Sequence, residues 1–402
     1  MALVLAALVA ASGVSPTHAA ELFVADQTGN RIVVLDALSG AYKRTLWSTP
    51  AQVQPSAIAF GPGGDLFVAN RLSGEVLRIA AADLDGSAVA GAPFATGIDY
   101  PGSLAYHGAT NSMLVGEFGV YPEGPLGDEI FVYNAAGARQ ATLTLPPVAV
   151  AGLALDAAGN LFASGFVTDE FGSGRIYKFA GPNWSTPTPL APDPYPMANF
   201  QGAAGLAFDP QGNLYAAGLI TFNAGNVVKF SLADVAVTAQ QQLGDFLPFP
   251  SGITMLPEGR LLVASLGFGP TSGNLYRVNI ETGARSNVLA GDFNSDGNVD
   301  AADLVRWRQG FGLDDRADAD LDGDTDGSDF TVWQRSVGNQ GPPGLYSPAA
   351  VALRPETAAV GVPEPAFGLL AAAAAVGLRA AGRRWGSRSA ARGGKVSPRA
   401  DR

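Results

Sequence analysis

Cysteine is absent from this 402-residue sequence, and histidine occurs only at His18 and His107. The lack of cysteine excludes disulfide bonds, cysteine-ligated zinc and thiol catalysis. Two histidines leave little material for histidine-based metal binding or for a catalytic triad. The stability of the fold therefore has to come from packing rather than from covalent cross-links.

Charged residues are also scarce, at 15% of the chain, and the net charge is −11. Residues 366–402 hold eight Lys or Arg and a single acidic residue, Asp401, so the rest of the chain is more acidic than the total suggests. An acidic body repels phosphate backbones and anionic membrane surfaces. We therefore expect no nucleic-acid partner.

The N-terminal residues MALVLAALVAASGVSPTHAA form an apolar run that contains no Lys or Arg. The run ends at Thr17–Ala19, a small-x-small sequence of the kind cut by signal peptidase. We interpret residues 1–19 as an export signal. A buried N-terminal helix is the alternative, and Gly13 and Pro16 count against it because both break helices.

The central part of the chain repeats itself, as the segments AGLALDAAGNLFASGF and AGLAFDPQGNLYAAGL illustrate. Equivalent apolar residues recur every 46 to 53 residues, at Ile58, Leu104, Leu153, Leu206 and Ile253. Each unit alternates short apolar segments with turns rich in Gly, Pro, Asp and Asn, which indicates antiparallel hairpins. Repeats of this length are typical of propeller blades. We therefore predict a mainly β fold, a β-propeller over residues 20–290.

The segment ELFVADQTGNRIVVLDALSGAYKRTL, Glu21–Leu46, contains the second and third strands of a unit but not the first. It resembles an NHL repeat, and with five full units it implies a six-bladed NHL-like propeller. A propeller closes when both chain ends contribute to one blade, so the missing strand has to come from the C-terminal side. Within residues 339–361, the segment YSPAAVALRP at 346–355 is one candidate. A Pro/Ala linker is the other interpretation.

Carboxylates gather in the segment GDFNSDGNVDAADLVRWRQGFG, Gly291–Gly312, and again 26 residues later in DADLDGDTDGSDF. Both follow the calcium-loop pattern D-x-[DN]-x-D-G, with Asp instead of Glu at the closing position. After each loop, apolar residues recur with helical spacing. The expected ligands are Asp292, Asn294, Asp296, Asn298 (through its carbonyl), Asp300 and Asp303 in the first loop, and Asp318, Asp320, Asp322, Asp324, Asp326 and Asp329 in the second.

Two loops that are each followed, but not preceded, by a helix resemble a type I dockerin over residues 291–338. The resemblance implies two Ca²⁺ sites and a module that docks on a cohesin-like protein to attach enzymes of polysaccharide breakdown. Thr325 departs from the pattern, since the loops point an apolar residue inward there, as Val299 does in the first copy. The recognition positions, Ala301–Ala302 and Gly327–Ser328, match the family weakly.

The C-terminal segment VPEPAFGLLAAAAAVGLRAAGRRWG places an apolar run of about seventeen residues before a group of arginines. It resembles a PEP-CTERM sorting segment, here residues 362–385, followed by a basic tail, 386–402. The resemblance implies processing by an exosortase-type enzyme and transient membrane anchoring through the hydrophobic segment. The sorting motif comprises Val362, Pro363, Glu364 and Pro365.

A propeller does not specify a chemistry, so a site has to be argued from residues. The second strands of the three N-terminal units end in Asp26, Asn70 and Glu117. Their oxygens suit a divalent cation, and six-bladed lactonases use a similar set. Stabilisation of turns is the alternative.

Two further residues, His107 and Trp184, lie in turns or loops where a binding role has to be considered. His107 follows an inner strand, and we expect it to face solvent without a catalytic role. Trp184, on a Pro-rich loop, either stacks on a sugar ring or fastens its loop to its own blade.

The export signal and the sorting segment together predict a secreted or cell-surface protein. Our leading hypothesis is a non-catalytic binding protein, with the propeller as a platform for a ligand or partner and the calcium unit for attachment, to a cohesin-like protein or an extracellular polysaccharide. The alternative is a secreted enzyme, either a propeller lactonase or a component of polysaccharide breakdown. A third hypothesis gives calcium a structural role alone.

Overall fold

The computed structural model describes residues 20–119, 127–166, 174–191, 202–221, 224–267, 273–345 and 347–355. The predicted export signal, the sorting motif and the basic tail lie outside these residues. Within the described part, no helix has both the length and the apolar character needed to cross a membrane.

The described strands form six four-stranded antiparallel sheets. Blade 1 contains β24 (Pro348–Leu353), β1 (Glu21–Asp26), β2 (Arg31–Asp36) and β3 (Tyr42–Ser48). Blade 2 contains β4 (Pro55–Phe60), β5 (Leu66–Asn70), β6 (Glu75–Ile79) and β7 (Ala92–Thr96). Blade 3 contains β8 (Pro101–His107), β9 (Ser112–Glu117), β10 (Glu129–Asn134) and β11 (Arg139–Thr144).

The remaining blades follow the same order along the chain. Blade 4 contains β12 (Ala149–Leu155), β13 (Leu161–Phe166), β14 (Gly174–Phe179) and β15 (Pro187–Pro189). Blade 5 contains β16 (Gly202–Phe208), β17 (Leu214–Thr221), β18 (Ala224–Ala233) and β19 (Ala236–Leu247). Blade 6 contains β20 (Pro250–Met255), β21 (Arg260–Ser265), β22 (Asn274–Asn279) and β23 (Arg285–Asn287).

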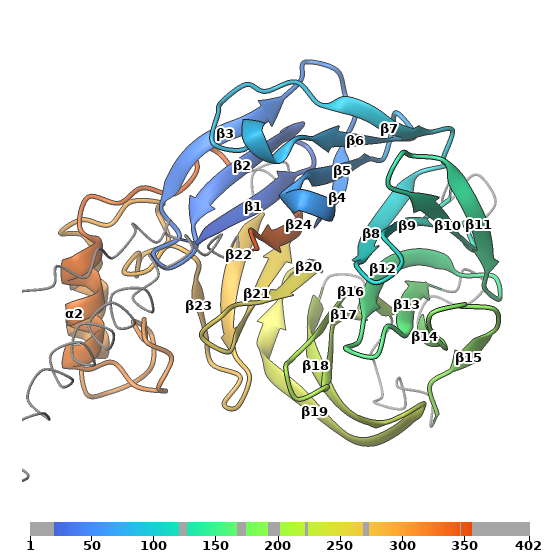
Figure 1. Cartoon of the computed structure of the whole chain (residues 1–402). Helices are drawn as coiled ribbons and strands as arrows, with labels where there is room; N and C mark the ends of the chain where they lie inside the picture. The colour runs from blue at the N-terminus through green and yellow to red at the C-terminus, as the bar shows by residue number, and fades with distance from the viewer. Residues whose placement is uncertain are drawn as a thin grey trace, which may run out of the picture. The chain divides into compact units, whose positions relative to one another are not determined.

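The six sheets stand around one axis, with β4, β8, β12, β16, β20 and β24 nearest the centre (Figure 1). This is a six-bladed β-propeller, as the repeats predicted. The residues that mark the repeat occupy one equivalent place on the inner strands. Ile58, Leu104, Leu153, Leu206 and Ile253 are all 7–8% exposed, and so is Val351 on β24, at 7%.

The ring is closed by the C-terminal strand β24, which pairs antiparallel with β1 through Leu22 and Leu353, and Ala25 and Ala350. Of the two interpretations of residues 346–355, the structure therefore shows the closing strand over the described part. Arg354 strengthens this junction, because its Nη1 lies 3.1 Å from the Glu21 carboxylate on β1.

The second strand of each blade is buried on both faces, because it packs between the neighbouring blades. All six residues of β1 and all five of β5 are buried. Between blades 4 and 5, for example, Phe162, Leu206 and Phe230 belong to one apolar cluster. Burial on both sides explains why these strands read as nearly continuous apolar runs rather than as alternating ones.

Each inner strand has a register shift near one end in its pairing with the second strand, as between Pro55 and Ala57 on β4. Neighbouring inner strands approach one another closely there. A Cβ on Gly152 would lie 2.3 Å from the carbonyl oxygen of Ala204, and one on Gly205 would lie 2.3 Å from that of Ser251. Glycine is needed at these positions because any side chain would push the blades apart.

The calcium-loop unit, residues 291–338, is inserted in the connection from β23 to β24, within the closing segment of the ring. It contains α1 (Asp303–Gly310) and α2 (Gly327–Ser336), one helix after each loop as predicted. Aromatic rings join the helices, with centroids 5.2 Å apart between Trp307 and Phe330.

The calcium-loop unit is hydrogen-bonded to three strands of blade 6. Asn279 at the end of β22 donates from Nδ2 to the Leu321 carbonyl oxygen at 3.0 Å, and Asn287 on β23 donates to Ser295 Oγ at 2.7 Å. Arg260 on β21 donates to the carbonyl oxygen of Asp320. Residues of both loops therefore contact the propeller.

Candidate functional site

The first acidic loop is organised by backbone N–H groups that point at two carboxylates. Asp292 accepts from the N–H of Asp296 at 3.1 Å and of Gly297 at 2.9 Å. Asp303, at the start of α1, accepts from Asn294 at 3.2 Å and also from Asp300. Gly297 has a φ of 84°, a left-handed conformation that favours glycine at this turn.

The second loop repeats this arrangement residue by residue. Asp318 accepts from the N–H of Asp322 at 3.2 Å and of Gly323 at 2.9 Å. Asp329, the third residue of α2, accepts from the N–H of Asp320 at 3.3 Å and of Asp326 at 2.7 Å. The same spacing in sequence thus produces the same loop twice.

The departure at Thr325 is accommodated within the second loop. Thr325 is fully buried, as Val299 nearly is in the first loop. Its hydroxyl accepts a hydrogen bond from the Ala317 N–H at 3.1 Å. A hydrogen-bonded threonine can therefore occupy this inward position, because its polar group is satisfied.

Four carboxylates of the two loops are buried: Asp292, Asp303, Asp318 and Asp329. Asp303 and Asp329 are fully buried, and neither forms an ion pair with Lys or Arg among the described residues. Burial raises the pKa of Asp318 to about 6, and the nearby charges of Asp329 and Asp322 add to the effect. Buried carboxylates are stable only when a cation or protons neutralise them.

The second loop brings its carboxylates together most closely. Two sets of three have oxygens that all lie within 4.8 Å of one another: Asp318, Asp320 and Asp322, and Asp324, Asp326 and Asp329. In addition, Asp320 Oδ1 is buried without a hydrogen-bond partner. An all-oxygen, carboxylate-rich set of this kind fits a calcium site.

The two loops are also linked to each other through tryptophan side chains. Trp307 on α1 donates from Nε1 to the carbonyl oxygen of Asp326, the ninth residue of the second loop, at 2.8 Å. Trp333 on α2 donates in the same way to Asp300, the ninth residue of the first loop, at 2.8 Å. Each helix thus fixes the loop that precedes the other helix.

The three propeller residues proposed as a ligand site lie at equivalent ends of β1, β5 and β9. Asp26 is buried and accepts from Arg31 Nε at 2.9 Å and from the Ser347 N–H at 2.8 Å. Asn70 is buried, and its Nδ2 lies 3.4 Å from Glu75 Oε1. Glu117 accepts from the Asp99 N–H at 2.9 Å, and burial raises its pKa.

A cavity of about 410 Å³ lies at the channel mouth, and Asp26, Asn70 and Glu117 are not among its lining residues. The next residue along each of the six second strands lines it instead. Consecutive side chains of a strand point in opposite directions, so a shift by one residue changes which of them faces the channel. These six lining residues are Gln27, Arg71, Phe118, Phe166, Leu219 and Leu266.

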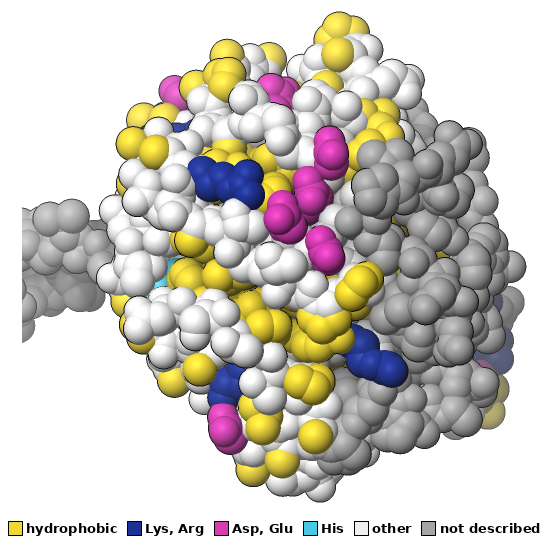
Figure 2. Space-filling view, turned by 90° about the vertical axis from the view of Figure 1, so that its right-hand side faces the viewer, with side chains coloured by type: hydrophobic (Ala, Val, Ile, Leu, Met, Phe, Trp, Pro, Cys, Tyr) yellow, Lys and Arg dark blue, Asp and Glu magenta, His cyan; other side chains and the backbone are white. Residues whose placement is uncertain are grey.

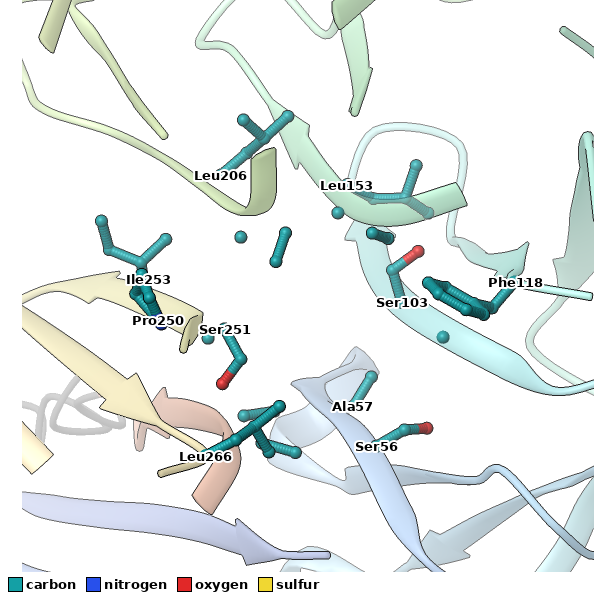
Figure 3. Close-up of a pocket in the computed structure, with 18 of the residues that line it drawn as sticks. Ser56, Ala57, Ser103, Phe118, Leu153, Leu206, Pro250, Ser251, Ile253 and Leu266 are labelled. Carbon is teal, nitrogen blue, oxygen red and sulfur yellow. The ribbon is translucent and has the colours of Figure 1, made fainter. Parts of the chain in front are cut away.

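The inner strands supply the rest of the cavity lining, and most of it is apolar. Leu153, Leu206 and Ile253 surround the open centre, with Phe118 and Leu266 at the periphery (Figure 3). The polar contributions come from few groups, mainly the serine hydroxyls of β4, β8 and β20. The volume lies within the about 300–1,000 Å³ that is typical of ligand pockets.

Two polar groups of the lining have an unmet hydrogen-bonding capacity. Arg71 is the one charged residue among the described residues that line the cavity, and its Nε is buried without a hydrogen-bond partner. Ser103 Oγ on β8 is likewise buried without a partner. By contrast, Ser56 and Ser251, at similar places on β4 and β20, donate to carbonyl oxygens of the next blade, Pro101 at 2.6 Å and Pro348 at 3.2 Å.

The expectation that His107 faces solvent was wrong. His107 ends β8 and is only 7% exposed, with Nδ1 2.7 Å from Thr110 Oγ1. Its ring packs edge-on against Trp184 with centroids 5.0 Å apart, and Trp184 is itself buried and donates to the Gly159 carbonyl oxygen. Trp184 therefore fastens its loop to the propeller, and His107 is covered by a neighbouring blade that the local sequence could not reveal.

One side of the molecule shows how charge is distributed on the surface (Figure 2). Acidic side chains gather there beside hydrophobic ones, whereas the basic side chains in this view stand apart from one another. A continuous basic stripe, the usual sign of a nucleic-acid surface, is not seen among the described residues of this face.

Comparisons with known proteins found distant structural similarity. No family model matches the sequence, and no curated protein matches it. A solved structure of virginiamycin B lyase from Staphylococcus aureus is similar with a TM-score of 0.41 and 15% identity, over 59% of this chain and 70% of that chain. For the calcium-binding protein regucalcin from Agrobacterium tumefaciens, the TM-score is 0.45 and the identity 18%, over 61% and 77% of the two chains.

Proposed function

We propose that this chain is a non-catalytic binding protein outside the cell, with the propeller as ligand platform and the calcium-loop unit as attachment module. The observation that carries the proposal is where large apolar side chains are exposed. Of the six in the described residues, four lie on the calcium-loop unit: Val305, Phe311, Leu313 and Val337. Apolar groups gathered on so small a unit favour a protein partner.

Calcium would organise this surface. The two loops would hold one ion each, through the carboxylates and carbonyls named above, and would thereby fix the starts of α1 and α2. Val305 belongs to α1, while Phe311 and Val337 directly follow the two helices. Extracellular calcium is abundant enough for sites of millimolar to sub-millimolar affinity, which is the regime of extracellular modules.

The predicted export signal and PEP-CTERM-like segment support a secreted or surface-held location, with exosortase-type processing of the tail. The resemblance to a dockerin supports a cohesin-like partner, and an extracellular polysaccharide is the other candidate. The exposed apolar side chains of the calcium-loop unit, Val305 and Phe311 among them, support a protein partner.

A secreted enzyme is the second candidate function, and one observation favours it. Burial raises the pKa of Glu117 at the end of β9, a property that recurs in general acids and bases. Against this, Asp26 is fully engaged by Arg31 and by the Ser347 N–H. Turnover of a lactone or a polysaccharide by the full chain, lost in Glu117→Gln, would replace the binding proposal.

The docking proposal is tested with the immobilised full chain and extracts of the native envelope and culture fluid. We expect one partner to be retained with millimolar calcium and lost with chelator. Val305→Asp combined with Phe311→Asp should abolish retention while calcium binding, measured by calorimetry, is kept. Leu38→Asp is the matched control, since Leu38 is a propeller residue that is 79% exposed. Retention by the double variant, or with chelator, would refute docking and leave calcium a structural role.

A further inference from the structure

The strongest unassigned feature of the propeller is the environment of Arg71 at the channel mouth. Its guanidinium lies over two aromatic rings, 5.3 Å from the centroid of Tyr100 and 4.8 Å from that of Phe118. No carboxylate of the described residues forms an ion pair with it. The rings hold the cation in place without neutralising it.

Partial burial of this guanidinium has a cost that no carboxylate of the described residues offsets. Desolvation lowers the pKa of Arg71, and the buried Nε lacks an acceptor. An arginine is never deprotonated at ordinary pH, so its charge persists in the apolar surroundings. Such a group binds an anion strongly, because pairing restores the interactions that burial removed.

The neighbouring groups narrow the class of anion. Ser103 Oγ, also in the cavity lining, is a second buried group without a partner, and as a hydroxyl it can donate to an acceptor. Leu153, Leu206 and Ile253 line the remainder of the cavity and offer only apolar contacts. A fully polar anion such as phosphate would leave this part of the cavity unused, whereas a molecule with an apolar body would fill it.

We propose that the channel-mouth cavity binds a small amphipathic carboxylate, with its charged group on Arg71 and Ser103 and its apolar body between the inner strands. The inference rests on the proposed function, in which the propeller is a ligand platform, and it specifies the ligand of that platform. An aromatic body suits this lining, because Phe118 and Phe166, an edge-on pair with ring centroids 6.4 Å apart, can add aromatic contacts.

The test compares two ligands of one shape, 2-naphthoate and the neutral 2-naphthalenemethanol, by calorimetric titration of the full chain. The carboxylate should bind more tightly. Arg71→Gln should weaken it by on the order of 10- to 100-fold and leave the alcohol unchanged, since one charge-assisted contact is lost. Arg139→Gln is the matched control, because that guanidinium also lies over a ring, 3.7 Å from the centroid of Phe131, but outside the cavity lining.

A second variant, Ala151→Trp, distinguishes a blocked cavity from a misfolded protein. Ala151 lines the cavity, so the indole should block both ligands while the thermal unfolding midpoint stays near that of the wild type. Equal affinities for carboxylate and alcohol would overturn the carboxylate assignment and leave the platform intact. Binding of neither ligand would overturn the cavity inference together with the platform, but not the calcium-dependent docking, which is measured separately.

Discussion

The propeller and the calcium-loop unit differ in the side chains that they bury, although they belong to one chain. The propeller contains six apolar clusters formed by buried residues of its blades. In the calcium-loop unit, the buried apolar side chains are few and small, Val299, Ala317 and Leu321, and they share the interior with four buried carboxylates. Apolar burial stabilises a fold in any buffer, whereas buried carboxylates do so only with their cation.

The largest effect on folding is expected when the buried carboxylates of the calcium-loop unit are removed. Asp303→Ala combined with Asp329→Ala takes away the closing carboxylate of both loops, together with the backbone hydrogen bonds that these carboxylates accept. We expect calcium binding to be lost and the helical signal in circular dichroism to disappear, while the β signal remains. Asp315→Ala, an exposed acidic residue between the loops, is the control. Loss of the β signal as well would show that the propeller depends on the unit.

The second-largest effect is expected from a substitution in the apolar core of the propeller. Phe162 on β13 is 1% exposed within the cluster between blades 4 and 5. Phe162→Ala should lower the free energy of unfolding by about 3–5 kcal/mol, through lost burial and the cavity that remains. Urea titrations with calcium and with chelator should give the same decrease. Leu38→Ala should change it by less than about 0.5 kcal/mol because Leu38 is exposed. A decrease that appeared only with chelator would contradict independent stabilisation.

Ion pairs also contribute to the stability of the propeller, and one group of them surrounds Glu21 at the ring closure. Burial alone would raise the pKa of Glu21, yet hydrogen bonds from Arg44 and Lys43 lower it from 4.5 to about 2. Because the folded-state pKa lies below the unfolded one, the contribution is complete above about pH 4.5 and is lost as pH falls toward 2.

Glu21→Gln should therefore cost about 1–3 kcal/mol at neutral pH. It should also remove part of the acid destabilisation between pH 4.5 and about 2. Unfolding followed at several pH values measures both effects. Identical acid profiles for wild type and variant would show that other carboxylates are responsible.

The same contrast explains what could be predicted from the sequence. The positions Ile58 to Ile253 repeat because each blade needs the same apolar residue at the channel, so the propeller was evident. The two matching loops, each followed by a helix, could be predicted because the calcium-loop pattern has a fixed spacing of carboxylates. The predicted ligand site at Asn70 stays a prediction, but the residue of this strand that lines the channel cavity is its neighbour Arg71. That choice depends on strand orientation within the ring, and the burial of His107 depends on the adjacent blade, neither of which a local pattern contains.

The smallest effect is expected on the calcium affinity of each single loop of the calcium-loop unit. Trp307 donates to Asp326 in the second loop and Trp333 to Asp300 in the first. In an Asp303→Ala chain, where only the second loop can close, Trp307→Phe should weaken calcium binding by about 2- to 10-fold, since one hydrogen bond that positions a loop carbonyl is lost.

Trp333→Phe should leave the affinity of that remaining site unchanged, because its indole contacts the disabled loop. In the complementary Asp329→Ala chain, the roles of the two tryptophans should be exchanged, and calorimetric titration measures all four cases. If both substitutions weakened the remaining site equally in both chains, the indoles would act through the joint packing of α1 and α2 rather than through the loop carbonyls. The two calcium loops would then form one cooperative centre, in contrast to the propeller, whose apolar clusters are distributed among its blades.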